Sequence, residues 1–216
     1  MLVSGSTNEF YQVPGIFSDP YKSVNYVECH DNHTLWDKLT LANPTQSDNV
    51  RASMHRLATA LTILSQGIPF LHAGQEFYRT KQGVENSYCS PDEINKLDWT
   101  QKALHMDTVE YVKGLIAIRK HHSVFRMLTK EEVKKNMYLL DTPAFVIAYM
   151  LKTANGMFVV AHNSAEETKE LILPSSGMWD ILVEDDRSSV TPFRSIEGSR
   201  ITLFPISTTV LFHPKG

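Results

Sequence analysis

The sequence lacks the features that identify several large classes of protein. It holds only two cysteines, Cys29 and Cys89, among 216 residues. A disulfide framework is therefore excluded, and we expect free thiols of a reducing compartment, with one bridge between the two as the alternative. No stretch approaches the roughly 20 apolar residues of a membrane span. The first residues lack the basic-then-apolar layout of a signal peptide, which favours a cytoplasmic location over a secreted one.

An excess of charge of one sign is also missing. The 21 Lys and Arg residues nearly balance the 24 Asp and Glu residues, which leaves a formal net charge of -3 and a sequence pI near 6.3. There is no basic patch for nucleic acid and no block of like charge that would form a tail. We therefore expect neither nucleic acid nor membrane as a partner, and a neutral or polar molecule fits better.

Several catalytic and metal-binding motifs are absent as well. The chain has no Gly-x-Ser-x-Gly elbow, no glycine-rich phosphate loop and no Cys-x-x-Cys or His-Glu-x-x-His spacing. Cys29, His30, Asp31 and His33 look like a set of metal ligands, but adjacent residues on a strand point to opposite faces and do not converge on one ion. We expect no metal ion and no cofactor.

What is present is a soluble globular composition with an apparent division into two parts. Hydrophobic residues make up 42% of the chain and charged residues 21%, which is enough for a core and for more than one domain. In the first part, strands are expected over 24–29 and 68–73. Between them, apolar residues recur at helical spacing from Ser47, a capping residue, to just before Gly67. Strand, helix and strand in this order are typical of parallel α/β folds.

The second part of the chain has a different period. A long polar loop over 78–99, of a length that is usually functional, precedes a helix over 109–120. Beyond about Asp141 the pattern alternates as in strands, with turn residues at 155–156 and at 176–177, and it predicts a small antiparallel sandwich. The expected strands are 145–151, 157–162, 168–173, 178–184, 200–204 and 207–212.

One polar cluster stands at the end of an apolar strand. The run His30-Asp31-Asn32 follows the strand over 24–29, and ligands of parallel α/β proteins bind where strands end in loops. The alternative is an ordinary turn, in which Asp and Asn bond to their own backbone. His72 and Glu76, four residues apart at the end of the next strand, are interpreted as structural polar groups.

Three segments together resemble a known family. Residues 25–39 are similar to the segment around the seventh barrel strand of the α-amylase family of glycoside hydrolases, most closely its bacterial type I pullulanases. Residues 67–77 resemble the eighth strand and the loop after it, and residues 85–95 resemble the loop that follows. The match runs from about Gly15 to about Trp99, and the β-rich remainder resembles the usual C-terminal sandwich.

The resemblance implies a retaining hydrolase of α-1,6 branch linkages in pullulan, amylopectin and related dextrins. It makes Asp31 the carboxylate that stabilises the transition state and His30 a ligand of a sugar hydroxyl where the bond is cut. Asn32, Asn86 and Tyr88 are candidates for lining the cleft. A carboxylate that grips ring hydroxyls as the sugar flattens toward an oxocarbenium ion binds the transition state more tightly than the ground state.

The resemblance also implies a fold class, α/β plus all-β, and a domain division. Residues 1–140 would be the C-terminal part of a catalytic (β/α)8 barrel, namely its last two strands and helices, and residues 141–216 a small antiparallel sandwich. The nucleophile and the acid/base would lie on the fourth and fifth strands, upstream of this chain, so the chain alone is expected to be inactive. Cys89 stands where the family pattern has Asn.

Two alternatives remain open. The chain could be a non-catalytic carbohydrate-binding or assembly module, or a subunit that completes a barrel supplied by another polypeptide. The expected partner is an α-glucan polysaccharide or oligosaccharide. Exposed strand edges and apolar faces also predict self-association, or pairing with the missing N-terminal barrel segment.

Overall fold

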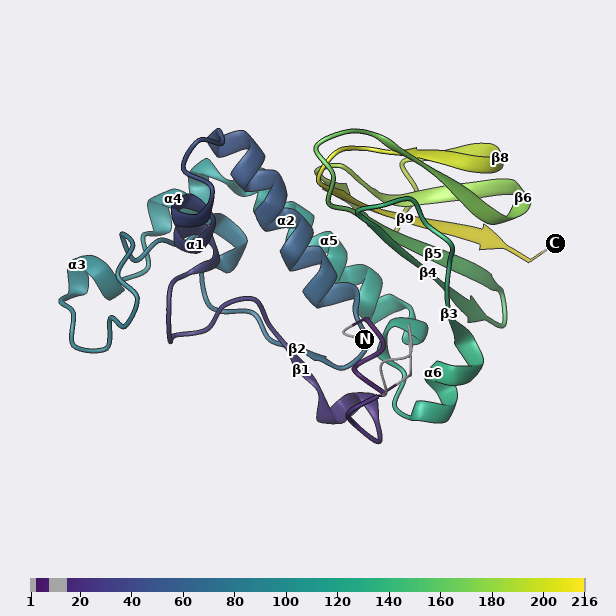
Figure 1. Ribbon diagram of the computed structural model, residues 1–216, viewed down its shortest axis with the longest axis horizontal. Helices are drawn as coiled ribbons and strands as arrows, with labels where there is room; N and C mark the ends of the chain where they lie inside the picture. Colours follow the sequence, from purple (N-terminus) through teal and green to yellow (C-terminus); the bar gives the residue numbers. More distant parts are fainter. Residues whose placement is uncertain (1–2, 8–14, 216) are drawn as a thin grey trace.

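The helices lie between Pro20 and Asn136, together with one short pair of strands, and a long series of antiparallel strands follows (Figure 1). The structure, a computed structural model, describes residues 3–7 and 15–215. In these ranges no helix is long and apolar enough to cross a membrane. The α-helices are α1 (Leu35–Ala42), α2 (Asp48–Leu64), α3 (Asp92–Asn95), α4 (Trp99–Leu104), α5 (Met106–His121) and α6 (Lys130–Asn136), and the short 3-10 helices are η1 (Pro20–Lys22), η2 (Gln75–Phe77) and η3 (Ser123–Arg126).

Local capping explains where the helices begin. The Thr34 side chain accepts a hydrogen bond from the backbone N–H of Asp37 at the start of α1, and the Ser47 side chain accepts one from Val50 at the start of α2. Each bond satisfies an N–H group that has no partner inside the helix. The helix predicted from Ser47 is therefore confirmed, and it ends at Leu64.

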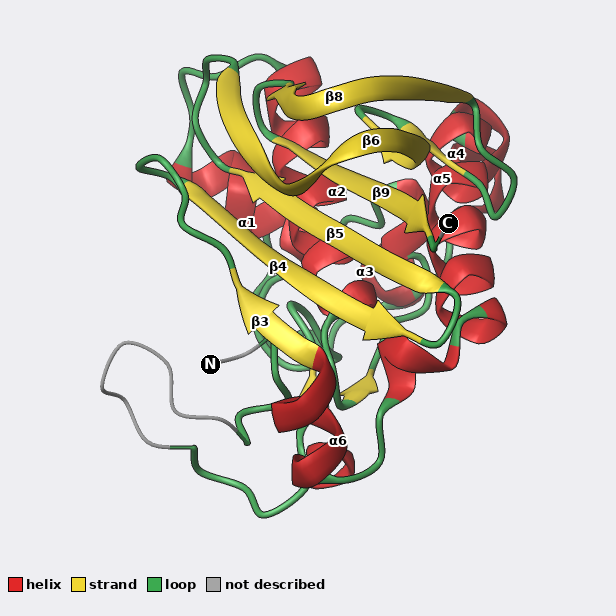
Figure 2. Cartoon of the chain, turned by 90° about the vertical axis from the view of Figure 1, so that its right-hand side faces the viewer, coloured by secondary structure: helices red, strands yellow, loops and turns green. Residues whose placement is uncertain are grey.

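The strands form one large sheet and one small pair. They are β1 (Val24–Asn25), β2 (Ile68–Pro69), β3 (Met137–Leu139), β4 (Val146–Thr153), β5 (Gly156–Asn163), β6 (Lys169–Glu184), β7 (Arg187–Ser188), β8 (Arg194–Leu203) and β9 (Ser207–Pro214). The large sheet is antiparallel in the order β3-β4-β5-β9-β6-β7, and β8 pairs with β6. Figure 2 shows the long, curved β6 and β8 lying across the sheet.

The two strands predicted over 168–173 and 178–184 are a single strand, β6. The predicted turn at 176–177 is wrong, because β6 continues through it and pairs with β8 on both sides of a register shift between Ile172 and Gly177. Gly177 has a φ of 138°, which an L side chain rarely adopts. An irregularity of this kind bends a strand without ending it.

Both faces of the sheet are buried, each in its own hydrophobic core. Tyr149 and Leu151 of β4 belong to the core that the sheet shares with α2 and α5. Val146 and Ala148 of the same strand lie on the other face, in a core with residues of β6 and β8. Successive residues of a strand point to opposite faces, so one strand contributes to two cores. The sheet is therefore the central layer, covered by helices on one side and by its own curled strands on the other.

The predicted fold class, with a C-terminal part of a (β/α)8 barrel in residues 1–140, is wrong. The strands expected over 24–29 and 68–73 are reduced to β1 and β2, two residues each, paired only with each other as strands in the part of the chain that the structure describes. A barrel needs every strand bonded on both sides, and Pro69 in β2 has no N–H to donate. The seven-stranded antiparallel sheet is the main sheet of the chain instead. The domain boundary predicted at residue 140 stays a prediction.

Candidate functional site

The loops that follow β1 and β2 enclose a polar cavity of about 210 Å3. One wall comes from the turn after β1, and the other comes from the chain between the end of β2 and the end of α3. The residues that line the cavity are His30, Asp31, His72, Arg79, Lys81, Asn86, Ser87, Tyr88 and Asn95. Two segments more than forty residues apart in sequence therefore meet in one site.

Four of the five residues predicted for the site line this cavity. His30 and Asp31 lie on the turn, and their side chains approach to 3.5 Å, between Nε2 and Oδ2. Asn86 and Tyr88 lie on the opposite loop. The Asp31 carboxylate is 68% exposed and the Tyr88 side chain is open to solvent, so both are free to meet a ligand. The roles predicted for these residues stay predictions.

Asn32, the fifth predicted residue, does not line the cavity but joins its two walls. Its backbone N–H donates to Oδ1 of Asn86 at 3.5 Å. Its φ of 59° is in the left-handed region, which Asn tolerates better than most residues. A turn at these residues is compatible with a site, because the turn presents Asp31 to the cavity, and the site interpretation stays a prediction.

Behind the cavity, a chain of hydrogen bonds orients His72. Its Nδ1 lies 3.0 Å from Oε1 of the buried Glu28, and its Nε2 lies 3.1 Å from Nη1 of Arg79. Because an arginine only donates, His72 Nε2 accepts the hydrogen bond from Arg79. The ring proton is therefore on Nδ1, which donates a hydrogen bond to Glu28. The other oxygen of Glu28 accepts the backbone N–H of Leu35 at the start of α1. His72 is therefore a fixed, fully bonded group of the wall.

Four further residues that line the cavity were not predicted from the sequence, namely Arg79, Lys81, Ser87 and Asn95, and His72 was predicted to be a structural group only. Arg79 and Lys81 lie in a polar loop, where charged residues are ordinarily solvated, so nothing local marks them. Asn95 bonds the loop together, since it donates to the carbonyl oxygens of Ser87 and Ser90. The one available signal was the length of the loop over 78–99.

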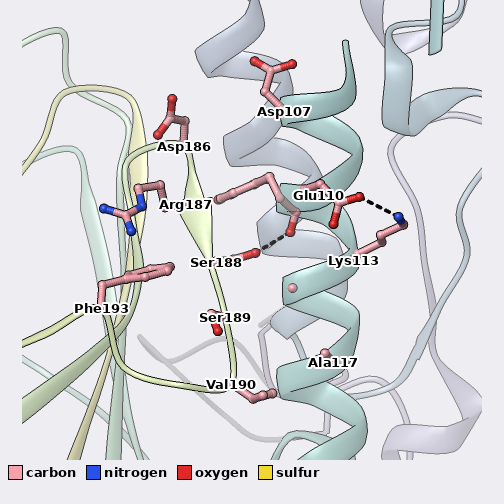
Figure 3. A pocket seen from close by; sticks show the side chains of 12 residues that line it. Asp107, Glu110, Lys113, Ala117, Asp186, Arg187, Ser188, Ser189, Val190 and Phe193 are labelled. Atoms are coloured by element: carbon pink, nitrogen blue, oxygen red, sulfur yellow. Dashed lines mark hydrogen bonds and ion pairs between the residues drawn. The ribbon is translucent and has the colours of Figure 1, made fainter. Parts of the chain in front are cut away.

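A larger cavity of about 490 Å3 lies between α5 and the segment around β7 (Figure 3). It holds none of the predicted residues. The Ser188 hydroxyl donates to the backbone carbonyl of Tyr111, and the Arg187 guanidinium lies 4.3 Å from the centroid of the Phe193 ring. The hydrogen bond joins α5 to β7, and the Arg187–Phe193 contact lies within the sheet side of the cavity, so we assign this cavity a structural role.

The number of carboxylates in the smaller cavity limits the reactions that it can catalyse. Asp31 carries the only carboxylate among its described lining residues. Retaining glycoside hydrolysis requires two carboxyl groups about 5 Å apart. Among residues 3–7 and 15–215, no three His, Cys, Asp or Glu side chains are grouped to hold a metal ion. The site offers hydrogen bonds, one carboxylate and an exposed aromatic ring, which suit the binding of a polyhydroxylated molecule.

The C-terminal part of the chain matches a known protein family. A family model described as the all-beta domain of pullulanase matches residues 133–187, which extend from α6 to β7. The chain therefore carries a pullulanase-type all-β domain. This match agrees with the antiparallel sheet and is the second finding against the partial barrel.

Individual pullulanases are similar to the chain in both sequence and structure. Pullulanase of Bacillus subtilis (strain 168) is 40% identical over 174 residues, which are 78% of this chain and 24% of the relative. The solved pullulanase from Bacillus acidopullulyticus superposes with a TM-score of 0.91 at 34% identity, over 98% of this chain and 26% of the other. The crystal structure of pullulanase type I from B. subtilis, complexed with maltose, gives a TM-score of 0.92 at 35% identity, over 99% and 30%.

The chain is thus a homologue of the bacterial type I pullulanases, and it spans about a quarter of the length of the B. subtilis relative. The family is one of glycoside hydrolases.

Proposed function

We propose that this chain is part of a pullulanase of the α-amylase family that hydrolyses α-1,6-glucosidic linkages in pullulan, amylopectin and related dextrins with retention of configuration. Asp31 stabilises the transition state and His30 bonds a sugar hydroxyl where the bond is cut. Asn86 and Tyr88 line the cleft, and Asn32 joins its two walls. The observation that carries the proposal is the cavity in which His30, Asp31, Asn86 and Tyr88 meet from two distant loops.

The physical argument rests on the exposed Asp31 carboxylate. An anion beside a sugar ring favours the positive charge that develops as the glycosidic bond breaks, so it contributes more to the transition state than to the ground state. Because Asp31 is the only carboxylate among the described lining residues, we place the nucleophile and the acid/base outside this chain. The chain by itself binds α-glucan and does not hydrolyse it.

The relatives support the choice of ligand. The B. subtilis pullulanase was crystallised with maltose, and a pullulanase from Anoxybacillus sp. LM18-11, 44% identical to this chain over 92% of its length, with maltotetraose. Both ligands are α-linked glucose oligomers. We therefore take maltotetraose as the probe for this chain.

Two measurements test the proposal. Isothermal titration with maltotetraose should show binding to the unsubstituted chain and a loss of binding in Asp31→Ala, while Asp141→Ala, an exposed acid outside the cavity, serves as the matched control. A reducing-end assay with pullulan should show no turnover. Clear turnover by the chain alone, or equal affinity in Asp31→Ala, contradicts the proposal.

A second candidate function is a non-catalytic carbohydrate-binding or assembly module. It is favoured by the family match, which covers the all-β domain and not the cavity. In that case maltotetraose binds to the sheet domain, so Asp31→Ala leaves the affinity unchanged and ligand-induced amide shifts concentrate in β3 to β9.

A further inference from the structure

Lys81 is a buried lysine in the lining of the cavity. The residue is 1% exposed, and its Nζ lies 3.2 Å from the carbonyl oxygen of His30, 2.5 Å from that of Asn32 and 2.9 Å from that of Glu85. An ammonium group has three N–H donors, so the three carbonyls use all of them. In the part of the chain that the structure describes, the ammonium is not paired with a carboxylate within 4.0 Å.

The three carbonyl groups that bind Lys81 lie next to residues predicted for the site. Two of them belong to the residues directly before and directly after Asp31, and the third belongs to the residue directly before Asn86. The Asp31 carboxylate itself is open to solvent and has His30 as its neighbour. Its position is therefore set by the backbone of the turn, and the Lys81 ammonium holds that backbone on both sides.

Lys81 is in turn held by α1. Its backbone N–H donates to Oδ2 of the buried Asp37 at 2.7 Å, and the Thr80 hydroxyl donates to the other oxygen of the same carboxylate. Asp37 lies in the first turn of α1, which is fixed by the Thr34 cap. A rigid helix thus supports Lys81, which connects it to both walls of the cavity.

Burying an ammonium group among neutral carbonyls costs solvation free energy, and an apolar side chain would fill the same space without that cost. The benefit of the buried ammonium group is that it holds the binding residues in place. Side chains that are already ordered before binding lose less conformational entropy when the ligand binds, so the affinity is higher. We propose that Lys81 is a positioning residue of the glucan site, which fixes the turn that presents Asp31 and the loop that presents Asn86. This inference rests on the proposed function.

The test compares Lys81→Met with Lys113→Met, an exposed lysine on α5 that pairs with Glu110. We expect Lys81→Met to bind maltotetraose about tenfold more weakly or worse, and Lys113→Met to bind as the unsubstituted chain does. Backbone ¹⁵N order parameters of residues 30–33 and 85–87 should fall in Lys81→Met from about 0.85 toward 0.6 or below, while those of α2 and β5 stay unchanged.

Unchanged affinity or unchanged order parameters in Lys81→Met overturn the inference. If the unsubstituted chain binds no maltotetraose, the proposed function fails, and the order parameters still decide whether Lys81 holds the two loops. If Lys81→Met does not fold, the test is made on the unsubstituted chain by measuring the exchange of lysine ammonium protons with water. The Lys81 ammonium protons should exchange far more slowly than those of exposed lysines. Exchange as fast as that of Lys113 overturns the inference.

Discussion

Arg119 is a second buried cation that is bonded to backbone carbonyls. It is 7% exposed, and its guanidinium donates to the carbonyl oxygens of Ile63, Ser65, Gly67 and Phe125. These groups surround the C-terminus of α2, where carbonyls lack partners within the helix and a positive charge is favourable. Burial lowers the pKa of Arg119 to about 10, so it stays charged at neutral pH.

Replacement of Arg119 by Met should lower the free energy of unfolding by about 3 kcal/mol or more, because several buried carbonyls lose their donor at once. Urea denaturation followed by circular dichroism measures the change. Lys113→Met removes an exposed ion pair and should stay within about 0.5 kcal/mol of the unsubstituted chain. A similar small effect for Arg119→Met would show that water replaces the guanidinium without cost.

Two buried histidines make stability depend on pH. Burial lowers the pKa of His55 to about 3, helped by the positive charge of Arg56, and burial lowers the pKa of His162 to about 4. Neither ring nitrogen of His55 has a hydrogen-bond partner among the described residues, while Nδ1 of His162 lies 2.9 Å from the Thr208 hydroxyl. Both rings are therefore neutral in the folded protein at neutral pH.

In the unfolded chain these histidines bind a proton near pH 6.5, which the folded protein does not do until pH 3 to 4. The unfolded state thus binds more protons between these values, and stability falls as the pH drops below about 6.5. At about pH 5.5 we expect a loss of about 1.4 kcal/mol for each histidine relative to pH 7.5. Urea denaturation at both pH values measures it. His162→Leu should reduce the difference and His121→Leu, on an exposed residue, should not.

At the scale of elements, the contact between α5 and β7 depends on Gly114. A Cβ atom at this position would lie 2.3 Å from the Ser188 carbonyl oxygen and 2.1 Å from its hydroxyl. The helix and the strand therefore approach more closely than any other residue would allow. Figure 3 shows β7 running beside the helix at this point, with the Ser188 side chain directed at it.

Gly114→Ala should therefore destabilise the protein by about 1 to 3 kcal/mol, through overpacking between backbones. In a helix without this contact the same change would stabilise the protein by up to about 1 kcal/mol. The sign of the change in the free energy of unfolding therefore shows whether α5 and β7 are in close contact. Thermal unfolding of Gly114→Ala measures it, and Lys120→Ala at an exposed position of the same helix is the control. A raised melting temperature in Gly114→Ala would contradict the close approach.

At the scale of the whole molecule, the small parallel pair leaves an apolar surface uncovered. Val24, Tyr26, Ile68 and Phe70 of β1, β2 and the residues after them are each about half exposed. Val24 is paired in register with Ile68, and the rings of Tyr26 and Phe70 meet edge to face with centroids 6.0 Å apart. Contiguous exposed apolar groups beside open strand edges favour association.

We therefore expect the isolated chain to self-associate with increasing concentration, as measured by light scattering after size exclusion. The double substitution Tyr26→Ser and Phe70→Ser should shift the chain toward the monomer. Tyr88→Ser, which removes an exposed aromatic ring at the cavity, should not change the association. A monodisperse monomer at every concentration would show that this surface is inert.

Features that depend on neighbours along the chain could be predicted from the sequence alone. Caps and spacing predicted α2, and alternation predicted the strands β4, β5 and β9 within a few residues. The cluster His30-Asp31-Asn32, with Asn86 and Tyr88, was located from a family resemblance. The resemblance also led to the error in fold class, because it assigned parallel strands where only two residue pairs form.

The burial of particular polar residues and the continuity of particular strands became visible in the folded structure alone. Lys81 and Arg119 are ordinary charged residues in the sequence, and their carbonyl partners lie up to 56 residues away. β6 passes through a Ser-Gly pair that is typical of a turn, because β8 pairs with it on both sides of the irregularity. Burial and hydrogen bonding between distant segments are properties of the folded chain, so no local pattern encodes them.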